Sequence, residues 1–112
     1  MDCVFCKIAN GEIPSKKAYE DDQVLAFYDL EPQAPVHVLI IPKVHIESAA
    51  MITPENSAIV AHIYVVAAKL AKELKLENGF RIVCNTGKDG GQTVPHLHFH
   101  LLGGRSMKWP PG

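Results

Sequence analysis

The order of apolar and polar residues predicts four strands. Residues 24–28 and 37–41 are short runs of strand-forming side chains, and Pro42 closes the second run, as is typical of a buried strand. Residues 80–85 and 96–102 alternate between apolar and polar side chains, which is the period of a strand with one buried face. Joined by short turns and one helix, these runs predict a mainly antiparallel sheet.

One long helix is predicted between the second and third strands. Thr53, Pro54 and Glu55 resemble a helix start, with a capping hydroxyl, a proline at the first helical position and an acid in the first turn. Apolar residues then recur at the helical period until Asn78 and Gly79, which form a stop signal. A short irregular or helical segment is predicted before residue 14. Together these elements predict an α+β fold.

The composition fits a single domain over residues 1–112. Hydrophobic residues make up 47% of the chain and charged residues 21%, which excludes a disordered or collagen-like chain. The net charge of −1 excludes bulk attraction to a nucleic-acid polymer or an anionic membrane, and no apolar run is long enough to span a bilayer. Three cysteines and a start that lacks the pattern of a secretory signal predict a reducing, cytoplasmic location.

Three histidines, His96, His98 and His100, occupy alternate positions near the end of the chain. On a strand they share one face, and the apolar residues between them share the other. Imidazole serves proton transfer, nucleophilic attack and metal ligation near neutral pH, so a metal site and covalent catalysis both remain open. The glycine-rich residues 86–93 can form an anion-binding nest of backbone N–H groups, which favours an anion beside the imidazoles.

Cys3 and Cys6 form a C-x-x-C pair at the start of the chain. The pair alone is compatible with a redox site, with a structural role and with half of a zinc site, since zinc needs two further ligands. A redox site is the least favoured of the three, because the pair precedes the first strand instead of lying at a strand-to-helix turn.

These motifs together resemble the histidine-triad (HIT) family of nucleotide hydrolases and transferases, in particular its Hint branch. Residues 96–102 match the family motif His-φ-His-φ-His-φ-φ, in which φ is apolar. The likeness extends over nearly the whole chain, at residues 3–8, 11–14, 19–22, 25–27, 40–43, 90–94, 102–105 and 109–112. It implies a HIT-like fold: a five-stranded mainly antiparallel sheet, one long helix and a short N-terminal helix. It also implies a homodimer whose two sheets join into one.

The resemblance implies that the protein hydrolyses the P–N bond of purine nucleoside 5′-phosphoramidates. His98 would be the nucleophile that attacks the α-phosphorus and forms a nucleotidyl-histidine. His100 would donate to a phosphate oxygen or to the leaving group, and His37 would be the partner histidine beside the nucleophile. The backbone carbonyl of His96 would accept the other ring N–H of the nucleophile. The remaining nucleotide-binding residues would be Phe27, Asp29, Leu30, Asn85, Gly91, Gln92, Thr93 and, reaching the partner subunit's site, Trp109.

In HIT proteins with an N-terminal C-x-x-C, the family pattern implies a structural zinc held by Cys3, Cys6, His45 and His96. Three alternative functions remain at this stage. They are a dinucleoside polyphosphate hydrolase, a nucleotide-binding regulatory module, and a metal hydrolase that uses His96, His98 and His100 as ligands. The resemblance does not decide between adenine and guanine.

Overall fold

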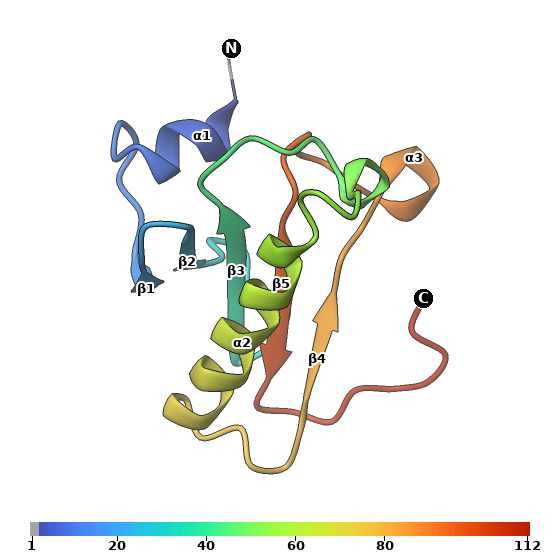
Figure 1. The fold of residues 1–112 in the computed structure, drawn as a ribbon. Helices are drawn as coiled ribbons and strands as arrows, with labels where there is room; N and C mark the ends of the chain where they lie inside the picture. The colour runs from blue at the N-terminus through green and yellow to red at the C-terminus, as the bar shows by residue number, and fades with distance from the viewer. Residues whose placement is uncertain (1–2) are drawn as a thin grey trace.

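Five antiparallel strands form the sheet that organises the chain (Figure 1). The computed structural model describes residues 3–112. The strands are β1 (Lys17–Glu20), β2 (Val24–Tyr28), β3 (Val36–Pro42), β4 (Phe80–Val83) and β5 (Phe99–Gly103). They lie in the order β1-β2-β3-β5-β4, so β5, the last strand in sequence, lies between β3 and β4. The α+β class and the five-stranded sheet are confirmed.

The helices cover the two faces of this sheet unequally. The long helix α2 (Ala58–Glu73) crosses one face (Figure 1), and the short helix α1 (Val4–Ala9) lies near the end of β3. A 3₁₀ turn, η1 (Ala49–Met51), precedes α2, and a four-residue helix, α3 (Gly87–Gly90), follows β4. Within residues 3–112, no helix combines the length and apolar character needed to cross a membrane.

Alternate side chains of β2 and β3 supply two separate cores. Val24 and Ile40 belong to the core shared with α2, whereas Leu25 and Ile41 belong to the core shared with α1. Both faces of these strands are therefore covered. This double burial explains why residues 24–28 and 37–41 are nearly continuous apolar runs and do not alternate.

The predicted start of the long helix is wrong by four residues. The helix begins at Ala58, and the signals at Thr53 and Pro54 belong to a turn. The side chain of Asn56 closes this turn: its Oδ1 accepts from the Thr53 N–H at 2.7 Å, and its Nδ2 donates to the Met51 carbonyl at 3.1 Å. A local side-chain bond here competes with the helix, as asparagine often does.

The histidine row is also less regular than predicted. Strand β5 begins only at Phe99, so His98 lies in the segment before it, His96 lies in a bend of that segment, and His100 lies within the strand. The glycine-rich segment, predicted as a loop, contains α3. Strand β1 had no distinct alternation in the sequence, and it pairs with β2 across a bulge between Lys17 and Tyr19.

Candidate functional site

A cavity of about 630 Å³ opens on the α1 side of the sheet. Its lining contains most of the predicted nucleotide-site residues: Phe27, Asp29, Leu30, His37, Asn85, Gly91, Thr93, His98 and His100. They come from β2, β3 and β5, from the segment that follows β2 and from the segment that joins β4 to β5. A second cavity, of about 640 Å³, lies between the end of α2 and the start of β4, and its described lining carries no acid, imidazole or thiol. The first cavity is therefore the candidate site.

The hydrogen bond of His98 determines which of its ring nitrogens is free. Its Nδ1 lies 2.7 Å from the backbone carbonyl of His96, as the family resemblance implied. A carbonyl oxygen can only accept, so Nδ1 carries the proton of the neutral ring. Nε2 then keeps its lone pair. His98 is 5% exposed at the cavity wall, and its bare nitrogen suits nucleophilic attack.

His37 and His100 form a chain of hydrogen bonds with a defined direction. The backbone N–H of Gln33 donates to His37 Nδ1 at 3.0 Å, so the proton of the neutral His37 ring lies on Nε2. His37 Nε2 lies 2.8 Å from His100 Nδ1 and donates to it. His100 therefore carries its own proton on Nε2. This arrangement leaves His100 as a hydrogen-bond donor beside the bare nitrogen of His98.

Burial keeps both of these imidazoles neutral. It lowers the pKa of His37, against the attraction of the nearby Asp29 carboxylate. Burial, reinforced by the neighbouring rings of His98 and His37, lowers the pKa of His100 to about 4. Both rings are then uncharged near neutral pH, as the directed hydrogen bonds require.

Asp29 lies at the edge of the hydrogen-bond network formed by His37 and His100. Its Oδ1 accepts from the Glu31 N–H at 2.8 Å, and its Oδ2 lies 3.5 Å from His37 Nε2. The donor atoms of Asp29, His37 and His100 lie within 4.8 Å of one another, which is close enough to surround a cation. The proton on His37 Nε2 points into that space, so these residues are arranged as a hydrogen-bond network.

Two predicted nucleotide-site residues lie outside the cavity lining. Gln92 uses its amide to brace its own loop: Oε1 accepts from the Gly87 N–H, and Nε2 donates to the carbonyls of Glu47 and Val94. Trp109 is 82% exposed in the C-terminal tail. Neither position contradicts a role in a dimer or in a bound complex, and both roles stay predictions.

Helix α1 supplies cavity residues that the sequence analysis missed. Val4, Phe5 and Ile8 line the cavity, although the sequence directed attention only to the cysteines of this segment. The signal was present, since these apolar residues are spaced as on one side of a short helix.

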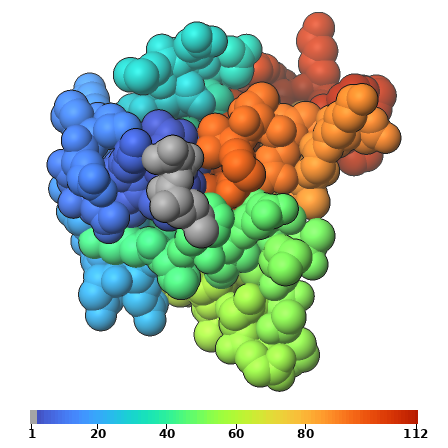
Figure 2. Space-filling model, turned by 90° about the horizontal axis from the view of Figure 1, so that it is seen from above, coloured from blue at the N-terminus to red at the C-terminus, as the bar shows by residue number. Residues whose placement is uncertain are grey.

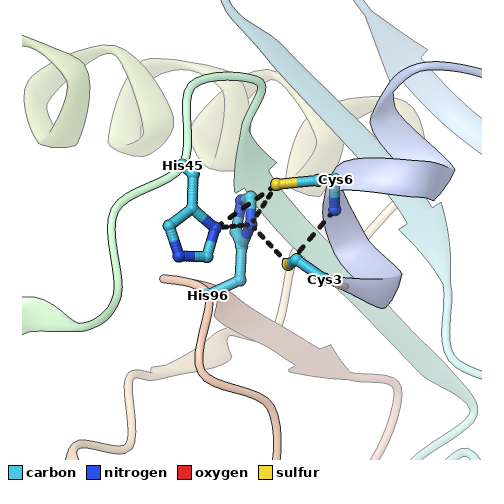
Figure 3. A group of neighbouring side chains, drawn as sticks. All are labelled: Cys3, Cys6, His45 and His96. Carbon is cyan, nitrogen blue, oxygen red and sulfur yellow. Dashed lines mark hydrogen bonds between the residues drawn. The ribbon is translucent and has the colours of Figure 1, made fainter. Parts of the chain in front are cut away.

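The four predicted metal ligands meet beside this cavity (Figure 3). The thiols come from α1 and the residue before it, His45 follows β3, and His96 precedes β5. Cys3 Sγ lies 3.2 Å from His96 Nδ1, and Cys6 Sγ lies 3.3 Å from His45 Nδ1. The two imidazole Nδ1 atoms are 3.2 Å apart. Figure 2 shows the corresponding blue, green and orange segments meeting on one face of the molecule.

The donor set fits tetrahedral zinc. Zinc bonds of about 2.0–2.3 Å to nitrogen and sulfur place neighbouring ligand atoms roughly 3.3–3.8 Å apart, close to the separations found here. His96 Nε2 lies 2.9 Å from the Pro42 carbonyl and must donate to it, so Nδ1 offers a lone pair to the cluster. Two thiols and two imidazoles leave no open position, so the cluster suits a structural zinc.

The cluster also separates His96 from the other two histidines of the row. Its metal-facing atom lies with Cys3, Cys6 and His45, whereas Nδ1 of His98 is engaged by a carbonyl. This geometry disfavours the alternative of a catalytic metal bound by all three histidines.

Known proteins are similar to this chain in sequence and in fold. The family model of the HIT domain matches residues 10–107. A histidine triad protein from Clostridium difficile is 56% identical, with 96% of this chain and 95% of that chain covered and a TM-score of 0.94. A HIT family hydrolase from Legionella pneumophila is 52% identical, with 99% and 100% covered and a TM-score of 0.97. A 14 kDa zinc-binding protein of Zea mays is 50% identical over 111 residues, which cover 97% of this chain and 87% of that protein.

The matched region includes the histidine row, the strands that carry it and the cavity they line. More than half of the residues are identical to those of two solved structures over nearly their full length, which is more than a shared fold. The chain belongs to the HIT family.

Proposed function

We propose that this protein is a hydrolase of purine nucleoside 5′-phosphoramidates that acts through a covalent nucleotidyl-His98 intermediate. The observation that carries the proposal is the hydrogen bond from His98 Nδ1 to the His96 carbonyl, which leaves Nε2 as a free nucleophile in the cavity. Membership of the HIT family and the likeness to the HIT family hydrolase from Legionella pneumophila support the reaction class.

The reaction then takes two steps at phosphorus. His98 Nε2 attacks the α-phosphorus, a P–N bond to the imidazole forms, and the P–N bond to the amine breaks. The amine takes up a proton from solvent. Water next attacks phosphorus, the bond to His98 breaks with its electron pair returning to Nε2, and the attacking water returns a proton to solvent. The products are the amine and the nucleoside monophosphate.

The other cavity residues hold the substrate and its charge. The Nε2–H of His100 donates to a non-bridging phosphate oxygen as negative charge develops there. The backbone N–H of Thr93 and the side-chain amide of Asn85 would share that charge, since both residues line the cavity. Gly91 would shape the same wall, because its own N–H donates to the Lys88 carbonyl at 3.1 Å. Asp29 accepts from the ribose hydroxyls, and Phe27 and Leu30 contact the base.

The proposal is tested with His98→Ala and with His62→Ala as the control. His62 lies on α2 and pairs with Asp21, outside the cavity lining. We expect His98→Ala to lose at least about a thousand-fold in kcat on an adenosine phosphoramidate, because covalent catalysis is removed, while AMP still binds. Mass spectrometry of a quenched single turnover should show the nucleotidyl adduct in the wild type and in His62→Ala. Retention of most turnover by His98→Ala would falsify the mechanism. A faster rate on dinucleoside polyphosphates would instead identify those as the substrate class.

Zinc would be held by Cys3, Cys6, His45 and His96 and would supply a structural cross-link. It ties the N-terminal segment to the segments that follow β3 and precede β5. The reacting phosphorus is attacked by an imidazole that is not among these ligands.

We also propose that two copies of the chain form a homodimer. Strand β4 ends the sheet, and the solvent-facing side of α2 carries Ala61, Tyr64, Val65 and Ala68. Charged residues would normally occupy the exposed side of such a helix, so these apolar side chains support an interface with a second copy.

The cysteines form no disulfide, which fits a reducing location such as the cytoplasm.

A further inference from the structure

One aromatic ring lies between the metal cluster and the proposed nucleophile. Phe5 is on α1, in sequence between the two cysteines, and only 7% of its surface is exposed. Its ring meets the His98 ring edge-on, with centroids 5.1 Å apart and an interplanar angle of 86°. It also meets the ring of His96, a predicted zinc ligand, at 5.9 Å, and that of Phe27 at 5.7 Å.

The two contacts of His98 restrict different motions. The hydrogen bond from Nδ1 to the His96 carbonyl holds one point of the ring and selects the tautomer. A ring held at one atom can still tilt about that bond. The edge-on packing of Phe5 opposes this tilt and so keeps Nε2 on its line of attack.

Helix α1 has little stability of its own to hold Phe5 in place. It is six residues long, well below the length at which isolated helices persist. Its first turn is capped by Cys3 Sγ, which accepts from the Cys6 N–H at 3.4 Å. The thiols of Cys6 and of Cys3, the residue before the helix, face His45 and His96 and so link α1 to the segments after β3 and before β5.

We propose that Phe5 is a positioning residue for His98, and that metal bound by Cys3, Cys6, His45 and His96 acts on the nucleophile by holding Phe5 against it. This inference rests on the proposed function of His98. It gives the structural zinc a measurable influence on the reaction without placing it at the reacting phosphorus.

The first test compares Phe5→Leu with Phe99→Leu. Phe99 adjoins His98 in sequence, is 6% exposed and makes a similar edge-on contact at 5.8 Å, but with Tyr64 on the α2 side of the sheet. The two variants therefore lose comparable packing on opposite faces. Zinc content is measured for each variant. A third variant, Phe5→Met, retains most of the apolar volume and is compared with Phe99→Leu in the same way.

The readout separates the rate of attack from nucleotide binding. We expect Phe5→Leu to slow formation of nucleotidyl-His98 at saturating adenosine phosphoramidate by about ten-fold to a hundred-fold, with the Kd for AMP changed less than about three-fold. Phe99→Leu should leave that rate within about two-fold of wild type. A raised Kd with an unchanged saturated rate would show that Phe5 is only a wall of the cavity, and equal slowing in both variants would show a general packing effect. Either result overturns the inference.

The second test follows the His98 ring directly, in protein labelled with ¹⁵N at histidine. We expect removal of zinc by a chelator to shift or broaden the His98 ring resonances in the wild type and in Phe99→Leu. In Phe5→Leu the signals should be altered already, and chelation should add little. Unchanged His98 signals on chelation of the wild type would overturn the inference. This measurement needs no turnover, so it still decides the role of Phe5 if the phosphoramidate proves to be the wrong substrate.

Discussion

At the scale of single residues, three histidines differ in which ring nitrogen the backbone engages. The carbonyls of Pro42 and His96 each accept from one histidine, His96 and His98, but at opposite ring nitrogens. The Gln33 N–H instead donates to His37. His98 keeps its proton on Nδ1, whereas His96 and His37 both keep theirs on Nε2 and differ in what faces Nδ1, the thiols or the Gln33 N–H. We therefore expect the same side chain to serve as a nucleophile, a metal ligand or a relay according to these partners.

The hydrogen bond from His37 to His100 leads to a testable difference between two substitutions. His37→Phe keeps a ring but cannot donate to His100, so the tautomer of His100 is no longer selected. We expect kcat for the phosphoramidate to fall about ten-fold to a hundred-fold, the usual range for losing a buried hydrogen bond that matters in the transition state. His37→Gln can place an amide N–H near the lost donor and should retain more activity. Equal kcat values for His37→Phe and wild type would show that the relay does not contribute.

His100 also makes stability depend on pH. Its pKa is lowered from 6.5 to about 4 on folding, so the unfolded chain binds more protons between these values. Stability is therefore fully present above pH 6.5 and is lost as the pH falls toward 4. We expect the urea midpoint of the wild type to fall over this window, and more steeply than that of His100→Gln. Both proteins keep the same zinc ligands, so the difference between their slopes reports His100; parallel slopes would contradict the assignment.

At the scale of elements, the sequence predicted strands better than boundaries. The strand at residues 24–28 was predicted with its observed limits, because buried runs with few polar residues have one interpretation at that length. The start of α2 was misplaced because Thr53 and Pro54 suit a turn as well as a helix start. The choice depends on Asn56, whose side chain bonds the Thr53 N–H and the Met51 carbonyl in the folded chain.

A close contact between β5 and the end of α2 gives a prediction at this scale. A Cβ added at Gly103 would lie 2.7 Å from Cδ1 of Leu76, whereas one at Gly90 would meet nothing nearer than 3.8 Å. We expect Gly103→Ala to destabilise the fold by about 1–3 kcal/mol, because Leu76 must move within a packed core. Gly90→Ala should change the urea unfolding free energy by less than about 0.5 kcal/mol. Equal stability of the two variants would mean that Leu76 can move away at no cost.

At the scale of the whole molecule, the site brings together segments that are far apart in the sequence. Local spacing was enough to single out His98 and His100, because they lie two residues apart. The zinc cluster joins Cys3 to His96 across 93 positions, so only the family resemblance could group its ligands in advance. Phe5 was missed for the same reason: the contact of this apolar residue with His98 exists only when the fold places α1 beside the segment that precedes β5.

The exposed side of α2 provides the last prediction, on assembly. Val65 is 63% exposed and lies among apolar neighbours on this side, whereas Val44, 61% exposed, lies in the segment after β3. A charge buried in an interface without a partner is strongly unfavourable, so Val65→Glu should convert the dimer to a monomer, and Val44→Glu should not. Light scattering coupled to size exclusion should give twice the chain mass for the wild type and for Val44→Glu, and the single chain mass for Val65→Glu. A wild type that is monomeric at tens of micromolar would refute the dimer, and a dimeric Val65→Glu would place the interface elsewhere on the surface.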